Sequence, residues 1–509
     1  MNSPRKGKLV NALTPDGFEL TSLGVAFLLL AHMAVWAVAA TIAQGSGGLH
    51  HDMTEAYDWG REFQLGYYKH PPLFSWIAGA WFVVFPRTDW AFYLLSAVSA
   101  GGGLLGVWFL AGRLMPNREQ TLSLLLLMLT PFFSVLAITY NANAALLLIW
   151  PWTAWAFVRS VQTGKLGDGA LFGLLAALAL LTKYSSIFLL LACFTAAILH
   201  RRRMAYFTCL APYAAMLVCA AVCLPHAIWV LEHPLTPVNY LLKKPVLPLQ
   251  AQLLAVGTSL LGAAALFALP QAAVAAALGA AASLRLLGKA ATTAIGADNR
   301  WLAALALGPL ALTVGCGFLF GVKLSTNYFL PALFMVPIAF TKFAEPGIAP
   351  ERRRIFWRFL AGWLLFGMLA APLVAIAAFV RHSDQSTEPA REIALEATRL
   401  WHEAFGQKLR LVAGTETYGL SAPFYSPDAP HLYLFATPAA SPWIAPSDLA
   451  RGGLLIICDH ADTKCAAIAL EAAPPSMQRR SVRLARDFLG WSSREFYFDL
   501  FMIPPGPQP

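Results

Sequence analysis

The residues best suited to chemistry lie in one polar stretch near the N-terminus, HHDMTEAYDWGREFQLGYYKHPPLFSW, at positions 50–76. It holds four carboxylates, three histidines and a Lys-His-Pro-Pro turn, and long apolar runs flank it. Ionisable groups beside a membrane are costly unless they face water or a substrate. A carboxylate can take a proton from an attacking hydroxyl, and a lysine or a metal ion can stabilise a departing phosphate. The stretch is therefore predicted to be a functional site.

Apolar runs make up most of the remaining chain and must position this stretch. Hydrophobic residues account for 58% of the 509 residues and charged residues for only 13%. Repeated apolar runs separated by short basic loops are typical of a polytopic helical membrane protein. Counting these runs gives about eleven spans, with the basic clusters on the cytoplasmic side. We expect a mainly α membrane part at residues 1–382.

The first apolar run, Leu20 to Ala43, follows a basic N-terminus. A cleaved signal peptide is one interpretation, but the run is longer than a signal sequence needs, so an uncleaved first span is favoured. The polar stretch then emerges on the outer face, in a first outer loop at residues 44–90. Pro72 to Phe85 is apolar but too short to span, and it is predicted to be an interfacial helix.

The composition changes near Ser383. A helical pattern at Glu388 to Phe405 is followed by four strand-like runs, LRLVAGT, GLLIICD, RSVRLA and REFYFDLFMI. This alternation predicts a small α/β domain at residues 383–509, on the outer (periplasmic) side because the span count is odd. No glycine-rich phosphate loop follows the early strands, so no nucleotide site is expected. Cys458 and Cys465 could form a disulfide if this region lies outside the cytoplasm.

The formal net charge of +10 does not indicate a nucleic-acid partner. The basic residues occupy short loops between apolar runs, where they set membrane orientation, and no nucleic-acid-binding motif is present. Membrane lipids are the expected surroundings instead.

On this topology, polar residues from many loops converge on the outer face. Carboxylates beside lysines and aromatic rings at a membrane surface suit a lipid phosphate that carries a sugar. The converging residues are Asp52, Glu55, Lys69, His70, Asn141, Asn143, Lys183, Tyr184, His226, Glu232, Tyr240, Lys243, Lys244, Lys323 and Tyr328.

Some of these residues also have simpler interpretations. Any single lysine can be an interfacial anchor, and this is favoured for Lys243 and Lys244. For Asp58 and Glu62 a solvated helix face is favoured over a role in chemistry. His226 and Glu232 are balanced between an acceptor site and an ordinary loop.

The first outer loop resembles that of the GT-C glycosyltransferases. The similarity is to the branch with lipid A aminoarabinose transferases and protein O-mannosyltransferases, in which an acidic residue opens the loop and Gly-Tyr-Tyr-x-His-Pro-Pro-Leu closes it. The matching positions are Asp52, Trp59, Gly66, Tyr67, Tyr68, His70, Pro71 and Pro72. Lys183-Tyr184 resembles a Ser/Thr-Lys-Tyr element that follows a later span in many members.

The chain departs from the family pattern at two places. The family commonly has Asp-Glu where this chain has Asp52-Met53, with Glu55 displaced, so either Asp52 or Glu55 is the catalytic carboxylate. The family's second acidic residue aligns near Asn143, so this chain lacks that carboxylate. Its loss leaves metal binding and the identity of the donor sugar open.

The resemblance implies transfer of a sugar, with inversion, from a polyprenyl phosphate to a periplasmic acceptor such as lipid A, lipopolysaccharide core or another envelope glycan. It places the protein in a bacterial inner membrane with the active site facing the periplasm. Asp52 would be the base or acceptor-positioning group, supported by Glu55, and Asp52 would also be the ligand of any divalent metal. Lys69, Lys183 and Lys323 would contact phosphate or a sugar carboxylate. The other residues expected to bind donor or acceptor are Tyr67, Tyr68, His70, Asn143, Tyr184, His226, Glu232, Tyr240 and Tyr328.

Two other functions are compatible with a polytopic membrane protein. A transporter or flippase would carry ionisable residues inside its spans and repeat-like halves, whereas here the charges gather at one face and no internal repeat is evident. A non-catalytic binder of lipid-linked glycans is the third hypothesis, kept open by Asn143.

Overall fold

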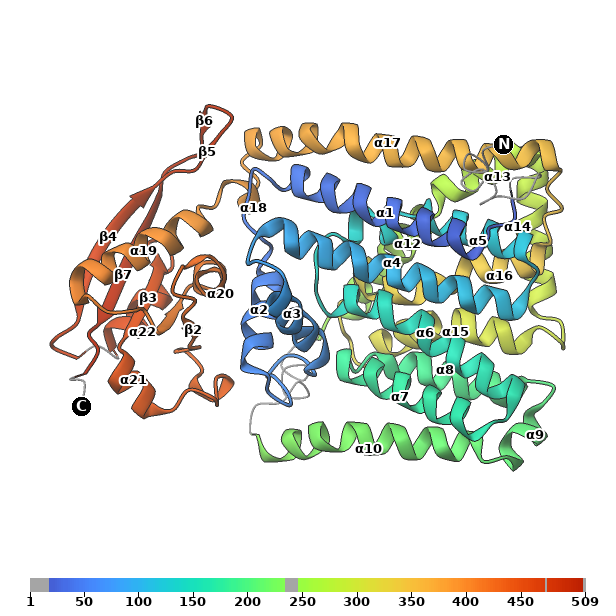
Figure 1. Ribbon diagram of the computed structural model, residues 1–509, viewed down its shortest axis with the longest axis horizontal. Helices are drawn as coiled ribbons and strands as arrows, with labels where there is room; N and C mark the ends of the chain where they lie inside the picture. The colour runs from blue at the N-terminus through green and yellow to red at the C-terminus, as the bar shows by residue number, and fades with distance from the viewer. Residues whose placement is uncertain (1–17, 234–245, 472–473, 507–509) are drawn as a thin grey trace, which may run out of the picture.

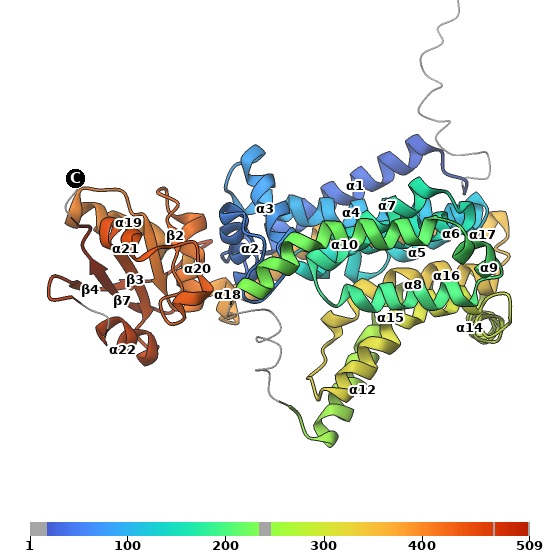
Figure 2. The ribbon, with the colours of Figure 1, turned by 90° about the horizontal axis from the view of Figure 1, so that it is seen from below.

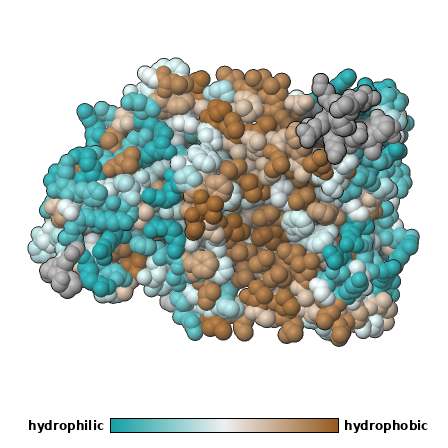
Figure 3. Space-filling model, in the orientation of Figure 1, coloured by the Kyte–Doolittle hydropathy of each residue, from teal (hydrophilic) through white to brown (hydrophobic). Residues whose placement is uncertain are grey.

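The structure is a computed structural model that describes residues 18–233, 246–471 and 474–506. Long helices run side by side in a bundle, and a smaller α/β part lies at one end of it (Figures 1 and 2). On the face shown in Figure 3, hydrophobic residues cover the middle of the bundle, while hydrophilic residues cover the α/β part and the opposite end. An apolar belt between two polar ends is the surface expected of a membrane-spanning bundle.

Six of the described helices are long and apolar enough to cross a membrane. They are α1 (Ser22–Ala43), α4 (Asp89–Leu114), α6 (Ala142–Thr163), α10 (Ala211–Glu232), α15 (Arg300–Leu319) and α17 (Pro350–Val380). A further pair, α12 (Leu249–Ala265) and α13 (Ala268–Leu278), meets the same criterion together and is bent by 45°.

Shorter apolar helices occupy other runs that the sequence predicts as spans. They are α7 (Leu166–Thr182), α8 (Ser186–Leu199) and Leu330–Ala344, which ends in α16 (Met335–Ala344). The described residues of this part also form α5 (Asn117–Met128), α9 (Arg203–Thr208) and α14 (Ala280–Ala294). The mainly α, polytopic architecture is therefore confirmed.

The first outer loop folds into two helices packed closely together, α2 (His51–Glu62) and α3 (Leu73–Val84). A Cβ atom on Gly60 would lie 2.2 Å from the Ser75 carbonyl oxygen, and one on Gly79 would lie 2.3 Å from the Gly60 carbonyl oxygen. Only glycine permits this approach of two backbones. The helix predicted at Pro72 to Phe85 is thus present as α3, which is apolar but shorter than a span.

The α/β part begins after α18 (Asp384–Thr387) with α19 (Ala390–Phe405) and contains a five-stranded sheet in the order β2-β1-β3-β7-β4. Its central strands are β1 (Leu411–Gly414), β3 (Leu454–Asp459) and β7 (Phe496–Ile503), with β2 (His431–Leu432) and β4 (Gln478–Leu484) at the edges. β1 is parallel to β2 and β3, and β7 is antiparallel to β3 and β4. A short hairpin pairs β5 (Asp487–Phe488) with β6 (Trp491–Ser492). Three further helices are α20 (Glu416–Tyr425), α21 (Pro446–Gly452) and α22 (Thr463–Glu471).

The four predicted strand-like runs correspond to β1, β3, β4 and β7, so the small α/β fold is confirmed. Cys458 at β3 and Cys465 on α22 form a disulfide.

The α/β part is docked on the first outer loop, chiefly through α20. Phe424 is 2% exposed, and its ring centroid lies 5.2 Å from that of Tyr57 and 5.5 Å from that of Phe82. The Arg87 guanidinium donates to the carbonyl oxygens of Pro423, Phe424 and Ser426 at 3.1, 3.3 and 3.1 Å. Apolar burial and charge-assisted bonds together fix the α/β part beside α2 and α3.

Candidate active site

The N-terminal end of α2 presents Asp52 toward the ends of the membrane helices. His50 caps the helix, because its Nδ1 accepts the Asp52 backbone N–H at 3.2 Å. The side chain of Asp52 is 36% exposed, and its Oδ2 accepts a hydrogen bond from Asn141 Nδ2 at 3.1 Å. Asn141 in turn caps α6, since its Oδ1 accepts the backbone N–H groups of Asn143 and Ala144. A carboxylate so held is oriented yet open to solvent.

Glu55 lies one turn further along α2 and is buried. It is 5% exposed, and its Oε1 lies 2.8 Å from Lys69 Nζ. The same ammonium lies 3.3 Å from Oε1 of Glu416, which begins α20. Glu416 is 66% exposed, so the α/β part adds a solvated carboxylate to a largely buried ion pair.

Burial sets the protonation behaviour of Glu55. Desolvation raises its pKa to about 7, and the neighbouring Lys69 ammonium opposes this rise. The attraction of Glu55 raises the pKa of Lys69 against its own desolvation, so the ammonium stays charged. The pair therefore changes from an ion pair to a neutral acid beside a cation as the pH falls through about 7.

A second lysine lies where α7 ends. Lys183 Nζ donates to Asn143 Oδ1 at 2.7 Å and lies 5.3 Å from the centre of the Tyr328 ring. Asp52, Asn141, Asn143 and Lys183 thus form one connected polar network, although they come from three separate parts of the chain.

Tyr184 and His226 belong to a structural link rather than an open site. The Tyr184 hydroxyl lies 2.7 Å from His226 Nε2, and His226 Nδ1 lies 2.6 Å from the Leu65 carbonyl oxygen. Since only a ring N–H can bond that carbonyl, Nε2 accepts from the hydroxyl. The next turn of α10 places Trp229 against Gly66, where a Cβ would lie 2.4 Å from the indole. These contacts hold the first loop against α10.

The Gly-Tyr-Tyr-Lys-His element is partly packing. Tyr67 is 1% exposed, stacks on Trp59 with centroids 4.8 Å apart, and donates its hydroxyl proton to the Trp59 carbonyl. His70 makes an edge contact with Phe74 at 5.5 Å. Tyr68 is only half-buried, and Lys69 Nζ lies 5.3 Å from its ring centre. Within this element Tyr68 and Lys69 line the site, while Tyr67 supports it from below.

Glu232 and Lys323 are not part of this network in the part of the chain that the structure describes. Glu232 is exposed at the last position of α10, and Lys323 is exposed between α15 and the short 3-10 helix Thr326–Tyr328. Tyr240 lies outside the described residues, as do Lys243 and Lys244.

The interpretation of Asp58 and Glu62 as a solvated helix face is wrong. Asp58 is 0% exposed, and among the described residues neither of its carboxylate oxygens has a hydrogen-bond partner. Glu62 is covered as well, and its Oε1 lies 2.5 Å from His431 Nδ1 on β2. The α/β part covers this face of α2, and a pattern within α2 alone cannot reveal that cover.

Glu416 belongs to no sequence motif and was not predicted as a site residue. The only available signal was its place directly after a predicted strand, where side chains of parallel sheets often meet ligands. Asn141 was placed on the outer face but was given no role, although it is the hydrogen-bond partner of Asp52.

The donor set that could hold a metal is His50, His51 and Asp52, whose ligand atoms lie within 4.8 Å of one another. Two imidazoles and a carboxylate suit a divalent ion such as Zn²⁺. Desolvation lowers the pKa of His50, although Asp52 opposes this, and a neutral imidazole is the form that binds metal. The residues fit such an ion, provided that His50 Nδ1 exchanges its helix-capping bond or the ring binds through its other nitrogen.

A known family resembles part of the chain. The profile of the family described as dolichyl-phosphate-mannose-protein mannosyltransferase matches residues 69–229. That range begins at Lys69 and ends within α10, so it includes Asn143, Lys183 and His226. No curated protein matches the chain.

Solved structures resemble nearly the whole chain. ArnT from Cupriavidus metallidurans bound to undecaprenyl phosphate superposes with a TM-score of 0.61 at 13% sequence identity, covering 94% of this chain and 98% of that one. The apo state of the same ArnT gives a TM-score of 0.57 at 14% identity with the same coverage. The likeness extends over both the helical bundle and the α/β part, and at this identity it concerns the fold.

Proposed function

The chain has the GT-C glycosyltransferase fold, and on that premise we propose that it transfers a sugar from a polyprenyl phosphate to an acceptor hydroxyl. The hydroxyl oxygen attacks the anomeric carbon, the bond from that carbon to the phosphate oxygen breaks, and polyprenyl phosphate leaves with inversion. The acceptor would be lipid A, lipopolysaccharide core or another envelope glycan. This proposal is carried by one observation: a partly exposed carboxylate, Asp52, lies in one polar network with a lysine from another helix end.

Asp52 is the proposed proton acceptor. A general base must reach the hydroxyl that it deprotonates, and its 36% exposure permits this, whereas Glu55 is covered. The Asn141 amide fixes Oδ2 of Asp52 through its hydrogen bond and leaves Oδ1 without a bond to that amide. Glu55 supports the site indirectly, because it holds Lys69 at 2.8 Å.

Lys69 and Lys183 are the proposed contacts of the sugar phosphate. A fixed ammonium stabilises the negative charge that grows on the leaving phosphate. Glu55 and Glu416 fix Lys69, and Asn143 fixes Lys183 at 2.7 Å, so neither side chain has to be ordered during the reaction. The aromatic faces of Tyr68 and Tyr328 beside these ammonium groups would contact the sugar.

A divalent metal held by His50, His51 and Asp52 is part of the proposal. Such an ion would supply positive charge to the sugar phosphate when bound.

We place the site on the periplasmic side of a bacterial inner membrane. The disulfide between Cys458 and Cys465 supports this orientation, because disulfides persist in oxidising compartments such as the periplasm. The ends of α1, α10 and α17 that adjoin the α/β part would then face outward (Figure 1).

The test is transfer of radiolabelled sugars from polyprenyl phosphate by the purified protein, with lipid A and envelope glycans as acceptors. Asp52→Asn should abolish transfer, and Glu55→Gln should reduce it. Asp487→Asn, at an exposed carboxylate on the β5–β6 hairpin, is the matched control and should leave the rate unchanged. Transfer that is unchanged in Asp52→Asn would refute the role of that residue. Binding of lipid-linked sugar without any transfer would favour a non-catalytic binder, and movement of the lipid across vesicles would favour a flippase.

A further inference from the structure

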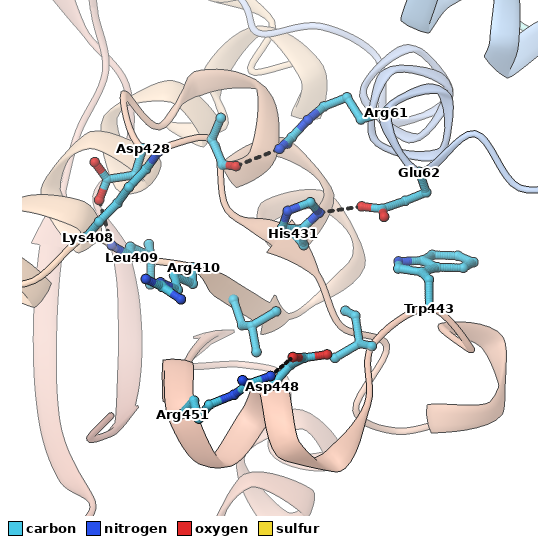
Figure 4. Close-up of a pocket in the computed structure, with 13 residues that line it drawn as sticks. Arg61, Glu62, Lys408, Leu409, Arg410, Asp428, His431, Trp443, Asp448 and Arg451 are labelled. Atoms are coloured by element: carbon cyan, nitrogen blue, oxygen red, sulfur yellow. Dashed lines mark hydrogen bonds and ion pairs between the residues drawn. The ribbon is translucent and has the colours of Figure 1, made fainter. Parts of the chain in front are cut away.

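A polar cavity of about 630 Å³ lies between α2 and the α/β part, away from the network around Asp52 (Figure 4). Arg61 and Glu62 enter it from α2, and Lys408 and Arg410 enter it from the segment before β1. The position of Arg61 nine residues after Asp52 places the cavity roughly 13 Å along the helix from the proposed base.

The carboxylates of the cavity wall already have partners. Glu62 is paired with His431 at 2.5 Å, and Asp448 is paired with Arg451 at 2.9 Å. Asp428 accepts the Leu409 backbone N–H at 2.7 Å and lies 2.7 Å from His402 Nε2. The wall nevertheless holds more basic than acidic side chains, because Arg61, Lys408, Arg410 and Arg451 face these three carboxylates.

Three cations in the wall lack such compensation. The Arg61 guanidinium donates to the carbonyl oxygens of Ala429 and Pro430 at 2.9 and 3.2 Å, which fixes it without neutralising it. For Lys408 and Arg410 no carboxylate oxygen lies within 4.0 Å among the residues that the structure describes. Basic side chains that line one cavity and have no carboxylate partner of their own can bind a phosphate or carboxylate group.

An aromatic residue completes the wall. Trp443 is half-buried, faces the cavity opposite Lys408 and Asp428 in Figure 4, and makes an edge contact with Tyr67 at 6.0 Å. Its indole Nε1 is buried and has no hydrogen-bond partner within residues 18–233, 246–471 and 474–506. A ring face beside polar donors is a common platform for a sugar ring.

We propose that this cavity binds an anionic sugar, one that bears a phosphate or a carboxylate. Arg61, Lys408 and Arg410 would bind the anionic group, and Trp443 would contact the sugar ring. This assignment rests on the proposed function. The sugar would be part of the acceptor, because elements of the α/β part form most of the cavity wall, while the ends of the membrane helices would hold the donor. The cavity would then hold the acceptor by its charged sugar while its hydroxyl reaches Asp52.

The test is isothermal titration of the full-length protein in nanodiscs with glucose 6-phosphate, glucuronate, glucose and inorganic phosphate. We expect a charged sugar to bind, with the first two ligands distinguishing phosphate from carboxylate as the anion. Lys408→Gln with Arg410→Gln should weaken this binding by on the order of 10-fold or more. Trp443→Leu should weaken the sugar but not inorganic phosphate.

The matched control is Lys464→Gln with Arg480→Gln, which removes the same charge from exposed positions outside the cavity and should leave binding unchanged. The proposal would be overturned if glucose or inorganic phosphate alone bound as tightly as the charged sugars, or if neither charged sugar bound. Equal weakening by the control pair would do the same. Asp52→Asn should lose transfer and keep this binding, so failure of the catalytic proposal can be told apart from failure of the cavity.

Discussion

Replacing Lys69 with methionine should raise the pKa of Glu55 above its value of about 7. Burial raises that pKa, and the Lys69 ammonium at 2.8 Å is the largest influence that opposes it. Methionine fills a similar volume but carries no charge, so desolvation would act on Glu55 with little to oppose it.

The magnitude follows from the geometry. An opposite charge within about 4 to 6 Å usually moves a carboxyl pKa by about 1 to 3, which corresponds to about 1.4 to 4 kcal/mol. The side chains of Glu55 and Lys69 are only 6% and 15% exposed, so solvent screens the pair weakly. The pKa of Glu55 in Lys69→Met should therefore lie at about 8 to 10.

Infrared titration of the buried carboxylic acid band measures this directly and does not depend on turnover. The band that disappears in Glu55→Gln identifies the residue, and Lys464→Met, an exposed lysine on α22, is the control. In the unmodified protein the transfer rate should also decrease as the pH is lowered through about 7, because protonated Glu55 no longer forms an ion pair with Lys69. A Glu55 band that is absent at pH 5, or that shifts to lower pH in Lys69→Met, would refute this account.

Three further results are expected. Burial raises the pKa of Asp58 well above its ordinary value. The Leu432 backbone N–H opposes this rise in part, although among the described residues it makes no hydrogen bond of normal geometry with the carboxylate. The folded protein thus binds this proton more tightly than the unfolded one, so the free energy of unfolding should fall as the pH rises. In Asp58→Asn the thermal midpoint in detergent should lose much of its decrease between pH 5 and pH 8, and an unchanged decrease would contradict this. Phe424→Ala should lower the free energy of docking by about 3 to 5 kcal/mol and expose the α/β part to proteolysis. Leu489→Ala, at a site that is 70% exposed, should do neither. Chelation by EDTA should reduce transfer and Zn²⁺ should restore it, with His51→Ala needing more Zn²⁺; full activity after exhaustive chelation would remove the metal from the mechanism.

The sequence predicted those features that depend on local pattern. Apolar runs and basic loops indicated the helical bundle, and alternating strand and helix patterns indicated the α/β part. The polar stretch at positions 50–76 was identified because its density of charge is unusual beside apolar runs. The first-loop motif also includes Lys69, which was predicted to contact phosphate or a sugar carboxylate; its ion pair with Glu55 at 2.8 Å was not predicted.

Contacts between distant segments could not be predicted in the same way. Glu416 lies 347 positions after Lys69, and His431 lies 369 positions after Glu62, so no periodicity connects them. The cover over Asp58 comes from the same docking, and for that reason its helix face looked solvated from α2 alone.

These distant contacts give the α/β part a place in the site itself. Phe424 fixes α20 against Tyr57, and the first residue of the same helix, Glu416, then reaches Lys69 at 3.3 Å. Any movement of the α/β part away from α2 would withdraw a carboxylate from Lys69 and expose Glu55 to water, which would lower the pKa of Glu55 toward its ordinary value. Docking of the α/β part and protonation of the buried pair are therefore linked, because a single helix, α20, takes part in both.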